Sequence, residues 1–252
     1  MVGALNLGAV HSILPGRVGG FNPDSLPGLA FWAAARLETT YAAGGSVGTM
    51  TDQSGEANNL TSAAAENQPT FRLAVIGTQP VYEFDGINDY LRNTAVSAMA
   101  DWSQSDHAII SVIRPTSVTE EDMISASNSG AGNDLLMVIT TGRGHTWRGA
   151  GDANAINTVS NLSADTNYIL SMMVDASNIN IYLNGSLEAG PTALSGAAGD
   201  GNEQLFVGNR SGTYGPGWYS GNIAELLIYT TAPSNAQMLE IHAWLNSIYR
   251  IY

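Results

Sequence analysis

Short segments of alternating apolar and polar residues, separated by turn residues about every ten positions, constrain the fold of this chain more than any other feature. Such alternation is typical of strands that bury one face, and turns this closely spaced favour a β-sandwich over βαβ units. The predicted strands lie within residues 29–37, 68–73, 79–91, 105–115, 134–140, 143–149, 167–175, 178–183, 204–209 and 222–230.

Residues 79–91, with the sequence QPVYEFDGINDYL, form the central segment of this pattern. Tyr82 and Phe84 lie on the strand face opposite Val81. Asp85-Gly86 supplies turn residues, so the segment predicts a central hairpin.

Two further turns and one buried strand follow from the pattern. Thr141-Gly142 joins two predicted strands, and Asn184-Gly185 is the strongest hairpin signal in the chain. Residues 105–115 are apolar on both faces and end at Pro115, which predicts a buried central strand.

The last part of the chain predicts a helix over residues 234–250. Ser234 and Gln237 have the spacing of a capping box. Because strand 222–230 is apolar on both faces, we expect the helix to lie on the outside of its sheet. The apolar stripe of this helix consists of Met238, Ile241, His242, Leu245, Ile248 and Tyr249.

The N-terminal residues 1–25 predict an extended arm, and residues 26–252 predict one domain that includes the helix. Residues 1–22 contain five glycines and no sustained period of either kind. The arm would dock on its own domain or on a neighbouring subunit; the alternative is a disordered tail. Candidate assembly residues are Leu5, Leu7, Val10, Ile13, Leu14, Arg17 and Phe21.

The charge balance excludes two classes of partner. The formal net charge is -13, and every basic side chain except histidine is an arginine, because the chain has no lysine. Such a surface repels phosphate backbones and anionic lipid, so we expect neither nucleic acid nor membrane as a partner. The chain has no cysteine, which excludes disulfides and thiolate metal sites. Residues 1–14 lack the basic region of a secretory signal.

Five motifs occur in a specific order: DQSG at 52–55, QP at 68–69, FDGINDYL at 84–91, IYLNG at 181–185 and GNIAELLIY at 221–229. This ordered set resembles the concanavalin A-like lectin/glucanase superfamily, in its laminin G-like jelly-roll branch, over nearly all of residues 26–252. The resemblance implies an all-β fold, a two-sheet antiparallel jelly-roll sandwich. It implies no particular activity, because this fold hosts many functions.

Catalysis is the first function to consider, because the glucanases of this superfamily carry a Glu-x-Asp-x-x-Glu pattern on one strand. The chain has no such pattern. Its Glu120-Glu121-Asp122 run falls in a predicted loop and lacks the third acid, and Glu83 and Glu225 each stand without a paired carboxylate nearby in sequence. We therefore predict that the protein is not an enzyme.

No cofactor is predicted, with calcium as the alternative. Asp85, Asn88 and Asp89 are the nearest cluster of oxygen ligands, although such spacing more often serves the backbone bonds of a turn. The four histidines show no paired ligand spacing, and we expect His242 to be packed or capped. They are His11, His107, His145 and His242.

Exposed aromatic residues mark the candidate contact sites. Tyr214, Trp218 and Tyr219 share a loop rich in glycine and proline, and Trp102 stands alone. A second group consists of Trp147 with Arg143 and Arg148. Each group could contact a glycan or a protein, or could fill the core.

The arrangement resembles jelly-roll proteins of tailed-phage virions. This resemblance predicts a structural protein of the particle, a capsid decoration or tail-associated protein that assembles through its N-terminal arm in the host cytoplasm. Its partners would be copies of itself and a capsid or tail protein. The alternative is a lectin-like adhesion module, extracellular or at a cell surface, that recognises polysaccharide. A divergent glycan-cleaving enzyme is the third hypothesis.

Overall fold

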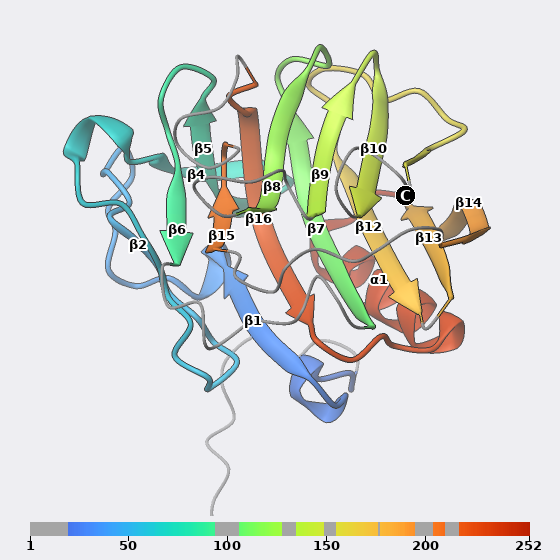
Figure 1. The fold of residues 1–252 in the computed structure, drawn as a ribbon. Coiled ribbons are helices and arrows are strands. Elements are labelled where there is room, and N and C mark those ends of the chain that lie inside the picture. The colour runs from blue at the N-terminus through green and yellow to red at the C-terminus, as the bar shows by residue number, and fades with distance from the viewer. Residues whose placement is uncertain are drawn as a thin grey trace, which may run out of the picture.

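The computed structural model describes residues 20–93, 106–127, 135–148, 155–175, 177–194, 204–209 and 217–252. In this part of the chain two eight-stranded antiparallel sheets pack face to face, and one helix lies behind them (Figure 1). The prediction of an all-β sandwich with a C-terminal helix is confirmed.

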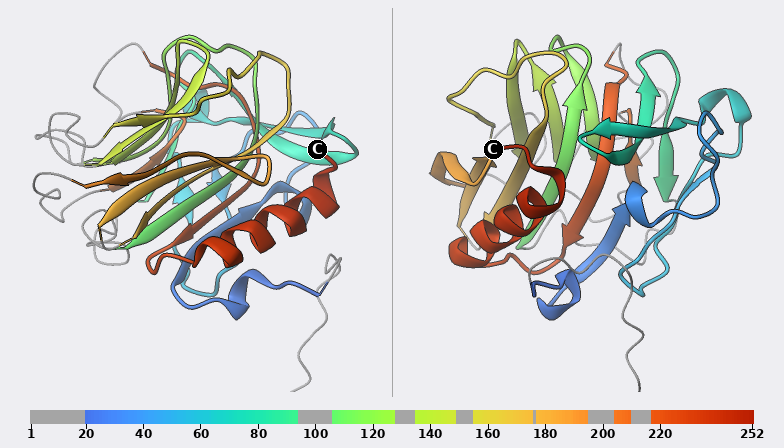
Figure 2. Two further views of the ribbon diagram at one scale, coloured as in Figure 1. Left: turned by 90° about the vertical axis from the view of Figure 1, so that its right-hand side faces the viewer. Right: turned by 180° about the vertical axis from the view of Figure 1, so that it is seen from behind.

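Sheet A is the middle layer, between sheet B and the helix (Figure 2). Its strands run in the order β14 (Ser186–Ala193), β13 (Asn178–Leu183), β12 (Tyr168–Asp175), β7 (His107–Pro115), β16 (Ser220–Tyr229), β5 (Gln79–Asp85) and β4 (Thr70–Ile76), and β1 (Leu29–Ala34) also pairs with β16.

Sheet B is the front layer of Figure 1. Its strands run in the order β11 (Ile156–Asn157), β10 (Arg143–Arg148), β9 (Leu135–Thr140), β8 (Glu121–Ser127), β15 (Gln204–Val207), β6 (Leu91–Asn93), β3 (Leu60–Thr61) and β2 (Thr49–Met50). Three short 3-10 helices complete the described elements: η1 (Pro23–Ser25), η2 (Ala35–Leu37) and η3 (Ala65–Asn67).

Alternation along the strands divides the buried side chains into two layers. Phe31, Tyr82 and Phe84 lie between the two sheets, whereas Trp32 and Val81 lie between sheet A and the helix. The predicted faces are therefore confirmed. Strand β7 contributes to both layers, as expected for a buried central strand.

Helix α1 (Asn235–Tyr249) covers the outer face of sheet A (Figure 2). Ser234 and Gln237 form the predicted capping box. The predicted stripe is buried, apart from Ile248, which is partly buried, and Trp244 joins it because the helix meets β1 as well as β16. Strand β16 is covered on both sides, with Leu226 facing sheet B and Leu227 facing the helix.

The predicted central hairpin is wrong. Strand β5 belongs to sheet A, but β6 pairs with β15 and β3 in sheet B. The turn between them carries the chain from one sheet to the other. Asp85 closes this turn, since its Oδ1 accepts hydrogen bonds from the backbone N–H groups of Ile87, Asn88 and Asp89. Asp89 Oδ2 in turn accepts the N–H of Asp85 at 2.9 Å.

The other two predicted turns are confirmed. Thr141 and Gly142 have φ values of 48° and 76°, and Asn184 and Gly185 have values of 48° and 79°. Positive φ at both central residues is typical of the tight hairpin turn that matches the twist of the flanking strands. These turns join β9 to β10 and β13 to β14.

The N-terminal part of the described chain is anchored beside the helix. The Phe21 ring lies 5.6 Å from the Trp244 ring, and the hydroxyl of Tyr229 donates to the carbonyl of Pro23. Phe21, which was predicted to be an assembly residue, thus packs against its own domain. The other assembly candidates lie outside the described residues: Leu5, Leu7, Val10, Ile13, Leu14 and Arg17. No helix within the described ranges is long and apolar enough to cross a membrane.

Candidate functional site

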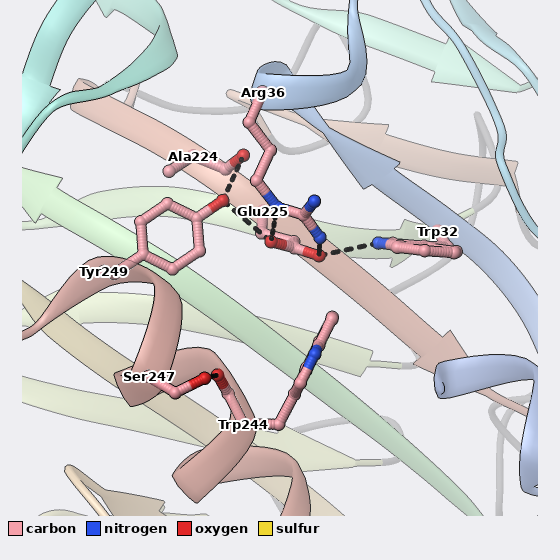
Figure 3. A network of polar contacts seen from close by, with 7 residues as sticks. All are labelled: Trp32, Arg36, Ala224, Glu225, Trp244, Ser247 and Tyr249. Carbon is pink, nitrogen blue, oxygen red and sulfur yellow. Dashed lines mark hydrogen bonds and ion pairs between the residues drawn. The ribbon is translucent and has the colours of Figure 1, made fainter. Parts of the chain in front are cut away.

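A buried polar network surrounds Glu225 (Figure 3). The Glu225 carboxylate accepts hydrogen bonds from Trp32 Nε1 at 2.7 Å and from the Tyr249 hydroxyl at 2.7 Å. The Arg36 guanidinium forms an ion pair with the same carboxylate at 3.1 Å. The network therefore joins β1, η2, β16 and α1.

This network is structural, because no solvent reaches its carboxylate. The Glu225 side chain is 0% exposed and that of Arg36 is 8% exposed. Burial raises the pKa of Tyr249 well above its ordinary value, and the charge of Glu225 adds to this shift. Burial lowers the pKa of Arg36, but the charge and hydrogen bonds of Glu225 outweigh it, so the pKa is raised. A ligand could not enter without undocking the helix.

Three aromatic side chains meet on the outer face of sheet B, and we call them the aromatic cluster: Tyr90, Phe206 and Trp218. The Tyr90 ring lies 6.4 Å from Phe206 and 6.2 Å from Trp218. Tyr90 and Trp218 are partly exposed, and Phe206 is buried beside them. The partly exposed rings of Tyr90 and Trp218 therefore face solvent, and the buried ring of Phe206 supports them.

Strand alternation explains why these rings face outward. Leu205 and Val207 point into the core between the sheets, so Phe206 points away from it. Leu91 likewise points inward, which places Tyr90 and Arg92 on the outer face. Arg92 is directly opposite Phe206 in the β6–β15 register and is exposed.

A frame of backbone hydrogen bonds holds Trp218 in place. The N–H of Asp122 donates to the carbonyl of Gly217 at 2.6 Å, and the N–H of Tyr219 donates to Gly208 at 3.0 Å. Gly217 packs so closely that a β-carbon there would lie 2.6 Å from Asp122 Oδ2. The indole is therefore presented from a fixed backbone, which lowers the entropy lost on binding.

Two members of the acidic run 120–122 belong to this frame, so the prediction of a loop is wrong for Glu121 and Asp122, whereas Glu120 lies in the loop before β8. Glu121 and Asp122 lie in β8 and are each 3% exposed. Glu121 Oε2 accepts the N–H of Ser220 at 3.2 Å. Burial raises the pKa of Glu121, although hydrogen bonds from Ser117 and Ser220 act in the opposite direction. Partners from distant strands made burial of these acids possible.

The turn before Tyr90 contains the predicted calcium candidates. The carboxylates of Asp85 and Asp89 accept backbone hydrogen bonds, and Asn88 supplies one of the donors. The pKa of Asp89 is raised to about 6, chiefly by burial; the backbone hydrogen bond from Asp85 lowers it, and the charges of Asp85 and Glu83 add to the rise. Within the described ranges no group of three histidine, cysteine, aspartate or glutamate side chains could hold a metal ion.

The structure places the predicted contact residues in different settings. Trp218 is partly exposed, as a contact residue must be. Tyr219 is buried, because its ring packs 5.9 Å from Phe84 and its hydroxyl donates to the Asn222 carbonyl, so it offers no contact surface. Arg143 is exposed at the first residue of β10 in sheet B and donates to the Thr158 carbonyl.

Four of the predicted contact residues have side chains outside the described part of the chain. Tyr214 and Trp102 lie outside the described residues, and the side chains of Trp147 and Arg148 in β10 also lie outside them. Tyr90, Phe206 and Arg92 are site residues that the sequence did not predict. The sequence contains a signal for these three residues, because they alternate with the apolar residues Leu91, Leu205 and Val207. If those apolar residues face the core, Tyr90, Phe206 and Arg92 face outward.

The family model described as the concanavalin A-like lectin/glucanases superfamily matches residues 84–238, more than half of the chain. This match spans the aromatic cluster. No curated protein sequence matches the chain.

Several solved structures share the fold. A Trypanosoma rangeli sialidase in complex with a difluoro-nononic acid is 12% identical with a TM-score of 0.62, over 95% of this chain and 36% of that chain. Domain 4 of AbnA, a GH43 extracellular arabinanase from Geobacillus stearothermophilus, in complex with arabinotriose, is 15% identical with a TM-score of 0.60, over 85% of this chain and 98% of that domain.

A third similar structure is the binding domain of Paraclostridial Mosquitocidal Protein 1. It is 15% identical with a TM-score of 0.60, over 88% of this chain and 52% of that chain. The chain spans about a third of the length of the sialidases that it matches. At these identities the likeness concerns the fold.

Proposed function

Because the chain belongs to the concanavalin A-like lectin/glucanase superfamily, we propose that it is a carbohydrate-binding module that holds polysaccharide against the aromatic cluster. One observation carries the proposal: Tyr90 and Trp218 present partly exposed rings, 6.2 Å apart, from a fixed backbone on the outer face of a sheet. Sugar rings bury their apolar C–H faces against such rings, while the polar edges of the sugar stay hydrated.

Two of the structures with the same fold support this proposal. One is a domain in complex with arabinotriose, and the other is a binding domain. We also propose that the module is not catalytic, since the sequence lacks the carboxylate pattern of the glucanases. Two acids beside the segment that carries Trp218, Glu121 and Asp122, are buried and serve as its frame.

Replacing Trp218 by alanine should weaken retention on an insoluble polysaccharide column by about fivefold to tenfold, because a stacked ring contributes about 1–1.5 kcal/mol. The melting temperature should change little, because Trp218 is partly exposed and outside the main core. Affinity electrophoresis in gels containing arabinan, galactan or glucan measures the effect.

The matched control is Tyr252→Ala, which removes a ring that is 54% exposed and lies against Gly185, away from the cluster. Retention of the Tyr252 variant should equal that of the parent chain. If Trp218→Ala binds as well as the parent does, the aromatic cluster is not the site.

A structural role in a virus particle is the second hypothesis. The anchor at Phe21 bears on it, because it fixes where an N-terminal arm would meet the domain. Phe21 and Pro23 fix the chain beside α1, which lies behind sheet A, whereas the aromatic cluster lies on the outer face of sheet B. The preceding residues could therefore contact a neighbouring subunit without blocking the cluster.

This hypothesis predicts that deletion of residues 1–19 lowers the oligomer mass measured by light scattering, because the arm would supply buried area between subunits. The domain itself should stay folded, since the deletion leaves Phe21 and Pro23 in place. An unchanged mass would contradict assembly through the arm and would leave the binding proposal unaffected.

A further inference from the structure

The charged side chains of the described residues are distributed unevenly. Six arginine side chains are described, and three of them pair with carboxylates: Arg36 with Glu225, Arg72 with Glu83 and Arg114 with Asp165. Arg92, Arg143 and Arg250 have no carboxylate partner within the described ranges. The chain has 22 acidic residues, which is enough for a carboxylate to pair with each of these three arginines.

Arg92 differs from the other two because it adjoins the aromatic cluster. It is directly opposite Phe206 in the register of β6 and β15, and Tyr90 precedes it by two residues on the same face. Its other neighbour across the sheet is Thr61 in β3, which is uncharged and exposed. An exposed guanidinium therefore stands at the edge of two partly exposed rings.

Three acids near this position are withdrawn from the surface, whereas Glu66 is exposed in η3, next to the Asn67 carbonyl that accepts the N–H of Tyr90, and forms no ion pair with Arg92 among the described residues. Glu121 and Asp122 lie beneath the segment that carries Trp218, and Asp89 is buried in the preceding turn. The other acids act through solvent, where the Debye length is about 8 Å at physiological ionic strength. The net charge of -13 therefore opposes an anion mainly at long range and low salt, whereas a direct contact with Arg92 acts locally.

We propose that the aromatic cluster and Arg92 together recognise a glycan that carries carboxylate groups, such as a uronic acid polymer. This inference rests on the proposed function and names the ligand class of the same site. The rings hold the apolar face of one sugar unit, and the planar guanidinium binds the carboxylate of that unit or the next through two parallel N–H···O bonds.

The test compares polygalacturonate with the same polymer after methyl esterification, which removes the charge and keeps the sugar. The parent chain should bind the free acid about tenfold more tightly than the ester, as expected for a charge-assisted contact. Arg92→Gln should remove this preference, and Arg92→Lys should restore only part of it, because an ammonium lacks the planar fork.

Arg250→Gln is the matched control. It changes the net charge equally, at an exposed position after α1 on the opposite side of sheet A. Its preference for the free acid should equal that of the parent chain. Because salt screens both the long-range repulsion and the contact with Arg92, acid and ester are compared at one fixed ionic strength.

The outcomes separate the two levels of the proposal. Equal binding of acid and ester by the parent chain, or an Arg92→Gln variant that keeps the preference, overturns the inference about carboxylates. In that case Trp218→Ala still tests the aromatic cluster on the neutral polymers. A preference for polysialate over polygalacturonate would keep the carboxylate and change the sugar that carries it.

Discussion

Glu225→Gln is expected to lower the free energy of unfolding by about 3–5 kcal/mol, the typical cost of breaking a buried ion pair by removing one partner. The glutamine matches the shape of the glutamate but leaves the Arg36 guanidinium, which is 8% exposed, without a counter-charge. It also weakens the acceptor shared by Trp32 Nε1 and the Tyr249 hydroxyl. Urea denaturation followed by tryptophan fluorescence measures the change.

The matched control is Glu83→Gln on the neighbouring strand β5. Glu83 also forms an ion pair with an arginine, but its side chain is 38% exposed and that of Arg72 is 47% exposed. Such surface pairs contribute about 0–1 kcal/mol, so this variant should remain close to the parent. Equal losses in the two variants would mean that the buried network does not fasten α1 to sheet A.

Acidification below pH 6.5 is expected to destabilise the fold through His242. Gly185 donates its N–H to Nδ1 at 3.0 Å, so Nδ1 must be the acceptor and Nε2 carries the proton toward Ser171 Oγ at 2.7 Å. Burial lowers the pKa of His242 from 6.5 to about 3. Between these values the unfolded chain binds a proton that the folded chain does not bind.

The sign follows from this difference. The contribution of His242 is fully present above pH 6.5 and is lost as the pH falls toward about 3, at about 1 kcal/mol per pH unit. Asp89 acts in the opposite direction, because its raised pKa of about 6 gives a contribution that is lost as the pH rises through that value. The His242 shift is larger, so the net effect of acid on these two groups is destabilising.

Urea denaturation at pH 7 and at about pH 4.5 should therefore show a loss smaller than the roughly 2–3 kcal/mol that His242 contributes, because Asp89 offsets part of it. His242→Gln should reduce this loss, and Asp89→Asn should increase it by removing the opposing contribution. NMR of the folded protein gives a direct check, since the His242 ring should stay neutral at about pH 4.5. A His242 ring that titrates near its ordinary value of 6.5 would contradict the prediction.

The two predictions concern contacts of one helix that the sequence could place only approximately. The capping box and the apolar stripe located α1 and identified His242 as a packed residue. The partners of His242 come from β12 and from the turn after β13, and those of Glu225 come from β1, η2 and α1. Sequence spacing carries no information on such pairings, because the segments are joined only by packing.

The candidate site shows the same limit. The loop composition predicts Trp218 as a contact residue, whereas the sequence around Tyr90 and Phe206 predicts only strands. Tyr90 lies more than 100 residues before Phe206 and Trp218 along the chain, and the three rings meet because β6 pairs with β15 and residue 218 forms a bridge with Asp122. The register that joins them depends on long-range strand pairing.

The sequence by itself determined what depends on neighbours along the chain: the alternation that divides side chains between two faces, the turns at Thr141-Gly142 and Asn184-Gly185, and the capped helix. Only the tertiary structure decided what depends on partners far along the chain. It assigned β5 and β6 to different sheets, buried Glu121 and Asp122 in β8, and left Arg92 exposed beside the aromatic cluster. The physical reason is that local periodicity fixes the face of a strand, whereas burial and charge pairing depend on which strand lies next to it.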